Sequence, residues 1–168
     1  MILIALGANE SSHAGPPEAT FRAALDVLAG RGIGIERLSR HFTSPAWPDP
    51  SDPPYTNAVA QIRTALTPFD LMAALHAVEA EFGRKRRVPN APRPLDLDLI
   101  DYEGRVQSPP EGPTLPHPRA AERAFVLAPL LDIAPDWRDP VSGRTGLDLL
   151  KIAEALGNQA FPAQINIP

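Results

Sequence analysis

The stretch Leu95-Asp-Leu-Asp-Leu-Ile-Asp-Tyr102 decides the fold, because apolar and acidic residues alternate over its first five positions. Successive side chains of a β-strand point to opposite faces, so the three leucines would share one face and Asp96 and Asp98 the other. The pattern therefore predicts a strand over residues 95–102 with its leucine face on a core. Two carboxylates remain on the opposite face, about 6.5–7 Å apart along the strand.

Hydrophobic periodicity predicts further strands and helices around this segment. Strands are expected over residues 2–6, 33–42 and 55–64, and helices over residues 21–30, 67–83, 125–133 and 145–156. Thr67 and Thr145 are of the residue type that caps helix N-termini, and Pro68 suits a first turn. Neither of the glycine-rich phosphate-loop motifs is present, which disfavours doubly wound nucleotide folds. We therefore expect an α+β fold, with a sheet and helices packed mainly on one side of it.

Composition excludes several classes of protein. The 168 residues fit a single domain, and the absence of cysteine excludes disulfide scaffolds, thiolate metal sites and thiol catalysis. The 21 prolines follow no period, which excludes collagen-like and solenoid repeats. A net charge of -4 disfavours general capture of nucleic acid. The apolar start, residues 1–6, is too short for a signal peptide or a spanning helix, so we expect a cytoplasmic protein without a membrane partner.

The acidic pair lies close in sequence to several arginines. Asp96 and Asp98 could together hold one or two hard cations such as Mg2+, although an isolated pair of this kind is more often a solvated strand face. Arg93 precedes Asp96 by three residues, and a basic run occupies residues 84–87. That run could equally be a solvated helix C-terminus, where cations are favoured. Carboxylates for metal beside arginines for phosphate are nevertheless typical of phosphoryl transfer.

Two other segments could contact a ligand. His117 lies between Pro116 and Pro118, which restrict the backbone and would hold the imidazole in place, although most lone histidines of this kind are surface residues. Tyr55 and Asn57 share a strand face and offer a stacking plane and an amide, the two groups that recognise a flat heterocycle. A half-buried strand with a polar end would show the same pair.

Taken together, these segments resemble the 6-hydroxymethyl-7,8-dihydropterin pyrophosphokinase family over nearly the whole chain. The matching segments, in order, are Leu6-Gly-Ala-Asn9, Ser44-Pro-Ala-Trp47, Tyr55-Thr-Asn57-Ala58, Glu79 with Gly83-Arg84-Lys-Arg86, Ala91-Pro-Arg93-Pro-Leu-Asp96-Leu-Asp98, Leu115-Pro-His117-Pro and Arg123-Ala-Phe125-Val-Leu. The acidic segment with its preceding Pro-Arg is highly specific when joined to the Pro-His-Pro and Arg-x-Phe segments.

The resemblance implies a ferredoxin-like α+β sandwich, with a mainly antiparallel sheet and extra elements, as one domain over residues 1–168. It implies transfer of diphosphate from ATP to the pterin hydroxymethyl group with release of AMP, in folate biosynthesis, with two Mg2+ ions. The protein would act as a monomer on these small molecules, without nucleic acid.

The resemblance also assigns roles to residues by position. Asp96 and Asp98 would ligate both metal ions, and Arg84 and Arg93 would stabilise charge on the transferred group as the remaining catalytic residues. The ATP site would be lined by His76, Glu79, Arg84, Arg86, Arg93, Leu99, His117 and Arg123. The pterin pocket would be formed by Ser44, Pro45, Ala46, Trp47, Tyr55, Asn57 and Phe125, with the rings of Tyr55 and Phe125 on either side of the pterin.

Two alternative functions are weaker. A regulatory nucleotide-binding module without activity would have no need for both aspartates together with Arg84 and Arg93. An RNA-binding ferredoxin-like domain needs exposed sheet aromatics and a basic face, whereas aromatic residues make up only 6% of this chain and its charge is negative.

Overall fold

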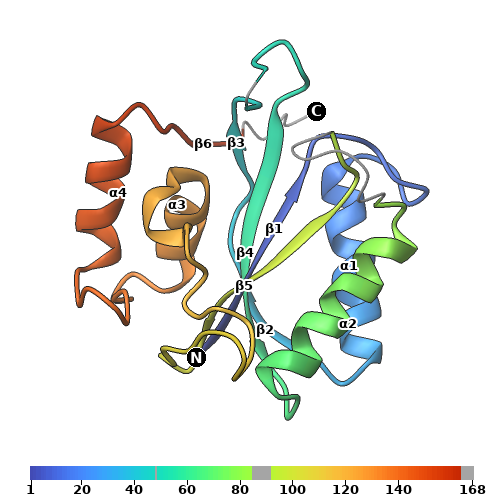
Figure 1. Ribbon diagram of the computed structural model, residues 1–168. Helices are drawn as coiled ribbons and strands as arrows, with labels where there is room; N and C mark the ends of the chain where they lie inside the picture. The colour runs from blue at the N-terminus through green and yellow to red at the C-terminus, as the bar shows by residue number, and fades with distance from the viewer. Residues whose placement is uncertain (48, 85–91, 164–168) are drawn as a thin grey trace.

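An antiparallel sheet of six strands lies between two pairs of helices in the computed structural model, which describes residues 1–47, 49–84 and 92–163 (Figure 1). Five strands follow one another across the sheet: β5 (Asp96–Tyr102), β1 (Ile2–Ala8), β4 (Tyr55–Arg63), β3 (Phe42–Ser44) and β6 (Phe161–Pro162). The sixth strand, β2 (Gly34–Leu38), also pairs with β4. Each of these pairings is antiparallel, which confirms the expected α+β fold.

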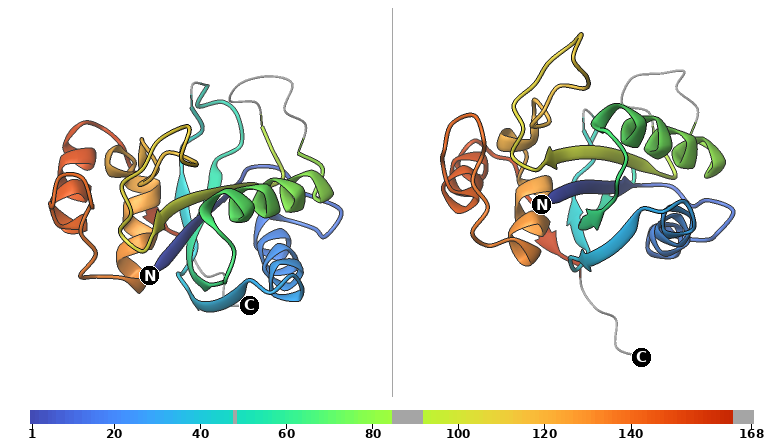
Figure 2. Two further views of the ribbon diagram at one scale, coloured as in Figure 1. Left: turned by 60° about the horizontal axis from the view of Figure 1, so that its bottom comes forward. Right: turned by 90° about the horizontal axis from the view of Figure 1, so that it is seen from below.

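The helices cover both faces of the sheet, so the expectation that they lie mainly on one side is wrong (Figure 2). One face carries α1 (Pro17–Gly30) and α2 (Pro68–Glu81); the other carries α3 (Ala124–Ile133), preceded by the short helix η1 (Ala120–Glu122), and α4 (Gly146–Ala155). The physical reason is visible in β1, where Ile2 and Ile4 pack with α1 and α2 while Leu3 packs with α3. A strand that is apolar at consecutive positions is buried on both faces.

The alternation predicted for residues 95–102 is confirmed over residues 95–99 and ends there, since Leu99 and Tyr102, three residues apart, lie in the same core. Leu95, Leu97 and Leu99 are at most 3% exposed and belong to the core under α1 and α2. Asp96 and Asp98 are half-buried, and the sheet register shifts beyond them, between Leu3 and Ile4 of β1. The acidic pair therefore lies on the α3 face of the sheet, at the N-terminal end of β5.

Both predicted caps are confirmed, since Thr67 Oγ1 accepts from the Asp70 amide at 3.2 Å and Thr145 Oγ1 from the Asp148 amide at 3.1 Å. The strand expected over residues 33–42 is divided into β2 and β3, and Arg40 between them bonds to Asp132 of α3. The C-terminal strand β6 was not expected. Within the described residues, no helix is both long enough and apolar enough to cross a membrane.

Candidate active site

The predicted site residues gather on the α3 face of the sheet, where three strands present side chains at the same level. In the register of the sheet, Gly7 of β1 is paired with Asn57 of β4 on one side and with Asp96 of β5 on the other. Tyr55 lies two residues from Asn57 on the same face, and Ser44 of β3 is its register partner. A row that runs Asn57, Gly7, Asp96 therefore connects the residues expected to bind pterin with those expected to bind metal.

The side chain of Asn57 is held in place at the pterin end of this row. It is 4% exposed, and its Nδ2 donates to Ser44 Oγ at 2.9 Å and to the Tyr55 carbonyl at 3.4 Å. These two bonds engage both Nδ2 hydrogens, so the atom that Asn57 can offer to an N–H group on a heterocycle edge is its fixed carbonyl oxygen, Oδ1. Ser44 is itself 4% exposed, so its bond with Asn57 is a packed polar contact rather than a surface one.

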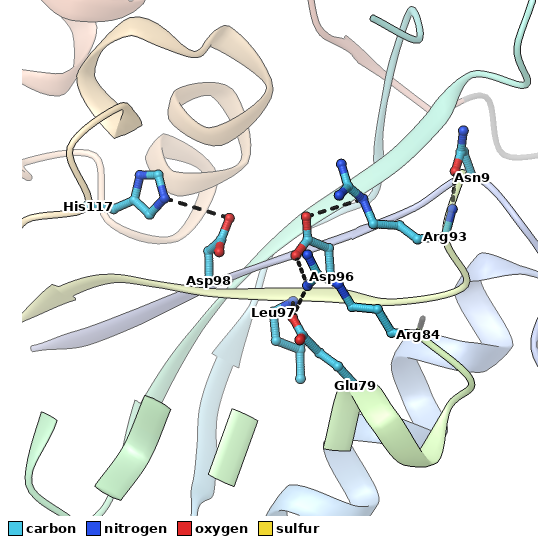
Figure 3. A network of polar contacts seen from close by, with 8 residues as sticks. All are labelled: Asn9, Glu79, Arg84, Arg93, Asp96, Leu97, Asp98 and His117. Atoms are coloured by element: carbon cyan, nitrogen blue, oxygen red, sulfur yellow. Dashed lines mark hydrogen bonds and ion pairs between the residues drawn. The ribbon is translucent and has the colours of Figure 1, made fainter. Parts of the chain in front are cut away.

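At the other end of the row, Asp96 is surrounded by two arginines (Figure 3). Arg84 pairs with Asp96 and also with Glu79 of α2, and Arg93 Nε lies 3.4 Å from Asp96 Oδ2. Glu79 is 1% exposed and its Oε1 accepts from the Leu97 amide at 2.8 Å. Because β5 is the last strand on its side of the sheet, that amide points away from β1 and needs a partner from outside the sheet.

Asp98 has a looser environment than Asp96. His117 Nε2 lies 3.8 Å from Asp98 Oδ2, and the His117 ring is oriented by the Arg119 amide, which donates to Nδ1 at 3.2 Å. The His117 amide donates to the Ile100 carbonyl at 2.8 Å, which fastens this segment to the outer edge of β5. His117 therefore faces Asp98, a contact that the sequence did not predict.

The two carboxylates oppose each other electrostatically. Burial raises the pKa of Asp98, and the neighbouring Asp96 raises it further. Burial lowers the pKa of His117 despite the attraction of Asp98. Burial acts to lower the pKa of Arg84, but Asp96 and Glu79 outweigh it, so that pKa is raised and the guanidinium stays charged. Two oxygen ligands held together at an electrostatic cost suit a hard divalent cation.

The aromatic residues predicted to sandwich the pterin are both half-buried. Each has a guanidinium over its ring: Arg93 Cζ lies 5.6 Å from the Tyr55 centroid, and Arg123 Cζ lies 5.4 Å from the Phe125 centroid. These arginines connect the aromatic residues with the acidic pair. The sandwich itself remains a prediction.

Other predicted residues are less closely gathered. Ala46 is buried, whereas Pro45 is exposed and Trp47 is 66% exposed, outside the cluster. The Leu99 side chain is in the core, so only its backbone can face a ligand. His76 lies half-buried on α2, a helix of the opposite face. Arg86 lies outside the described residues.

Asn9 is a site residue that the sequence reasoning did not assign. Asn9 is 7% exposed, and its Oδ1 accepts from the backbone amide of Arg93 at 2.9 Å. The backbone amide of Asn9 donates to the Arg93 carbonyl at 3.1 Å. Its Nδ2 donates to the Pro53 carbonyl at 3.2 Å. Asn9 thus joins the segment at Arg93 to the proline-rich loop (residues 45–54). Its place in the motif at residues 6–9 was the available signal.

Comparison with known proteins places this geometry in a family. Residues 3–135 match the family model described as 7,8-dihydro-6-hydroxymethylpterin-pyrophosphokinase (HPPK). The chain belongs to the HPPK family. A relative from Synechocystis sp., named 2-amino-4-hydroxy-6-hydroxymethyldihydropteridine pyrophosphokinase, is 41% identical over 99% of this chain and 88% of its own length. A Pseudomonas aeruginosa protein of the same name is 35% identical over 96% of both chains.

A solved structure supports the HPPK fold independently of sequence. The crystal structure of Plasmodium falciparum HPPK-DHPS superposes with a TM-score of 0.67 at 11% identity, over 90% of this chain and 40% of that one. In the described part of the chain, no three acidic or histidine side chains come together as a metal site. Any cation at Asp96 and Asp98 would therefore need oxygen ligands from substrate or water as well.

Proposed function

We propose that this HPPK-family protein transfers the diphosphate group of ATP to the hydroxymethyl group of 6-hydroxymethyl-7,8-dihydropterin, with release of AMP, in folate biosynthesis. The observation that carries the proposal is the row Asn57, Gly7, Asp96, which sets a heterocycle-reading amide beside an acidic pair. The names of the relatives from Synechocystis and Pseudomonas aeruginosa describe the same reaction.

On the pterin side, Asn57 would read the amide edge of the ring, because Ser44 holds its Nδ2 in a fixed direction. Tyr55 and Phe125 would stack on the two ring faces once their arginines turn to phosphate. Pro45, Ala46 and Trp47 would complete the pocket from the start of the proline-rich loop. Trp47 must move to do so, since it is largely exposed here.

On the phosphate side, Asp96 and Asp98 fit two Mg2+ ions, since both are half-buried carboxylates on one strand face. Bound there, the ions would neutralise charge on the transferred group and acidify the attacking hydroxyl. Arg93 Nε is buried and makes no hydrogen bond in the described residues, although Asp96 Oδ2 lies 3.4 Å away, so the guanidinium could turn to donate to a phosphate oxygen. Arg84 would act beside it, while His117 and Arg123 would bind the ATP phosphates.

The remaining ATP contacts stay predictions. Glu79 would act by holding Arg84, the Leu99 backbone and His76 would lie near the nucleotide, and Arg86 would come from the basic run. We also propose that residues 1–168 act as one cytoplasmic, monomeric domain.

The decisive experiment measures AMP formed from ATP by the purified protein with Mg2+ and the pterin alcohol. AMP should appear only when both substrates are present, in a one-to-one ratio with pterin diphosphate. A control without pterin measures background hydrolysis. ATP consumption that yields ADP, or AMP formation that ignores the pterin, would overturn the proposal.

A further inference from the structure

Gly7 occupies an unusual place for a glycine. It lies inside β1, which has β4 on one side and β5 on the other, and it is partly exposed although its strand is not at an edge. It lacks the positive φ that calls for glycine at positions such as Gly83, where φ is 91°. The backbone at Gly7 is therefore one that any residue can adopt.

Packing within the protein does not require a glycine there either. A Cβ added at Gly7 would lie 3.7 Å from Asn57 Oδ1 and 3.8 Å from Asp96 Cβ, both ordinary van der Waals distances. Alanine would thus fit without displacing anything. Because glycine in a strand interior costs stability relative to alanine, the folded chain alone would favour alanine at this position.

A glycine that neither backbone nor packing demands marks a place where a ligand comes close to the main chain. The two residues that an added methyl group would touch belong to the pterin end and the metal end of the site. Neighbouring strands are about 4.8 Å apart, so Asn57 and Asp96 are separated by roughly 9.5 Å across β1. A pterin whose amide edge meets Asn57 would extend its hydroxymethyl arm over Gly7 towards Asp96.

We infer that Gly7 is a specificity-determining residue, the floor beneath the pterin arm at the point where it meets the transferred group. This inference rests on the proposed function. The absent side chain sets how deeply the arm lies between Asn57 and Asp96. A single methyl group at Gly7 would lift the arm from the sheet and misplace the attacking oxygen, and small misplacements of reacting atoms slow reactions strongly.

The test substitutes Gly7→Ala and uses Gly34→Ala as a matched control. Gly34 also lies in a strand without a positive φ, and the nearest atom to an added Cβ is the Arg63 carbonyl oxygen, again at 3.7 Å. Thermal unfolding and steady-state kinetics are measured for both variants and the wild type. We expect Gly7→Ala to unfold at the same or a higher temperature than wild type and to lose at least ~10-fold in kcat/KM for the pterin. The KM for ATP should change less than about 2-fold, and Gly34→Ala should retain wild-type kinetics.

The outcomes separate the inference from the function on which it rests. A Gly7→Ala enzyme with wild-type kcat/KM for the pterin would overturn the inference and leave the proposed function intact. A drop in unfolding temperature of Gly7→Ala alone would also overturn it, since the glycine would then serve packing. Absence of pterin-dependent AMP from the wild-type protein would instead overturn the proposed function.

Discussion

Replacing Asp98 by asparagine should stabilise the metal-free protein and abolish its turnover. Asp98 and Asp96 project from the same face of β5 (Figure 3), and burial together with Asp96 raises the pKa of Asp98 against the attraction of His117 and Arg123. An ionised Asp98 is thus a net cost to the folded state at neutral pH. Asparagine keeps the size of the side chain and removes that charge.

The magnitude follows from the strand geometry. Two unit charges about 6.5–7 Å apart repel each other by about 2.4 kcal/mol at an effective dielectric constant of 20. The Asp98 side chain is 33% exposed, so solvent screening reduces this to about 1 kcal/mol. For a chain of this length, a gain of about 1 kcal/mol raises the unfolding temperature by roughly 2–4 °C.

The assay compares thermal unfolding of wild type, Asp98→Asn and Asp96→Asn in EDTA, and then with Mg2+ and ATP. Asp96→Asn should be the opposite case: it breaks the ion pair with Arg84, and should lose about 1–3 kcal/mol. Both variants should lose the stabilisation that Mg2+ and ATP give to wild type, and turnover should fall by about 100-fold or more. An Asp98→Asn protein that unfolds below wild type in EDTA would refute the repulsion argument, and one that keeps full turnover would refute the metal assignment.

Three further predictions concern single residues, one in the site and two elsewhere in the fold. Arg84→Ala should reduce kcat by at least ~10-fold with less effect on pterin binding, because the guanidinium is expected to act on the transferred group. Steady-state kinetics and direct titration of the pterin measure the two effects, and equal effects on both would contradict that role. Trp137→Phe should lower the free energy of unfolding by about 1–3 kcal/mol in urea titrations, since Trp137 Nε1 donates to the buried Asp101 carboxylate at 2.7 Å. An unchanged urea midpoint would show that this hydrogen bond adds nothing to the stability of the fold. The hydrogen bond from Arg40 lowers the pKa of Asp132, so its stabilisation is complete above the unfolded pKa near ~3.9 and is lost as pH falls through the lower folded value. Asp132→Asn should therefore be less stable than wild type at pH ~7 and converge with it once the pH falls below the lowered pKa of Asp132 in the folded protein. A difference that persists when Asp132 is protonated in both states would contradict the ionic origin.

The parts of the fold that follow from local patterns could be predicted from the sequence. The alternation in residues 95–99 predicted both the buried leucine face and the acidic face, because strand periodicity is a property of the backbone alone. The caps at Thr67 and Thr145 are equally local, since each threonine bonds to an amide three residues later. Asn57 and Tyr55 share a face for the same reason.

Features that depend on register and on distant segments could not be predicted in this way. The expectation that Glu79 lines the ATP site stays a prediction, and the structure adds that Glu79 satisfies the outward amide of Leu97 and pairs with Arg84. Which amide of an edge strand lacks a partner is known only when the order of strands is known. The position of Gly7 between Asn57 and Asp96 also depends on two sheet registers at once.

The arrangement around Arg84 indicates how the site could change between its free and loaded states. In the free protein Arg84 neutralises both Glu79 and Asp96, and its raised pKa means that it cannot give up its charge to make room for a cation at Asp96. It can only move. Glu79 is 1% exposed and is also bonded to Leu97, so it stays in place and keeps one side of the guanidinium. In the proposed reaction, Asp96 would hold the cation, and Arg84, still paired with Glu79, would turn its other side from Asp96 to a phosphate oxygen.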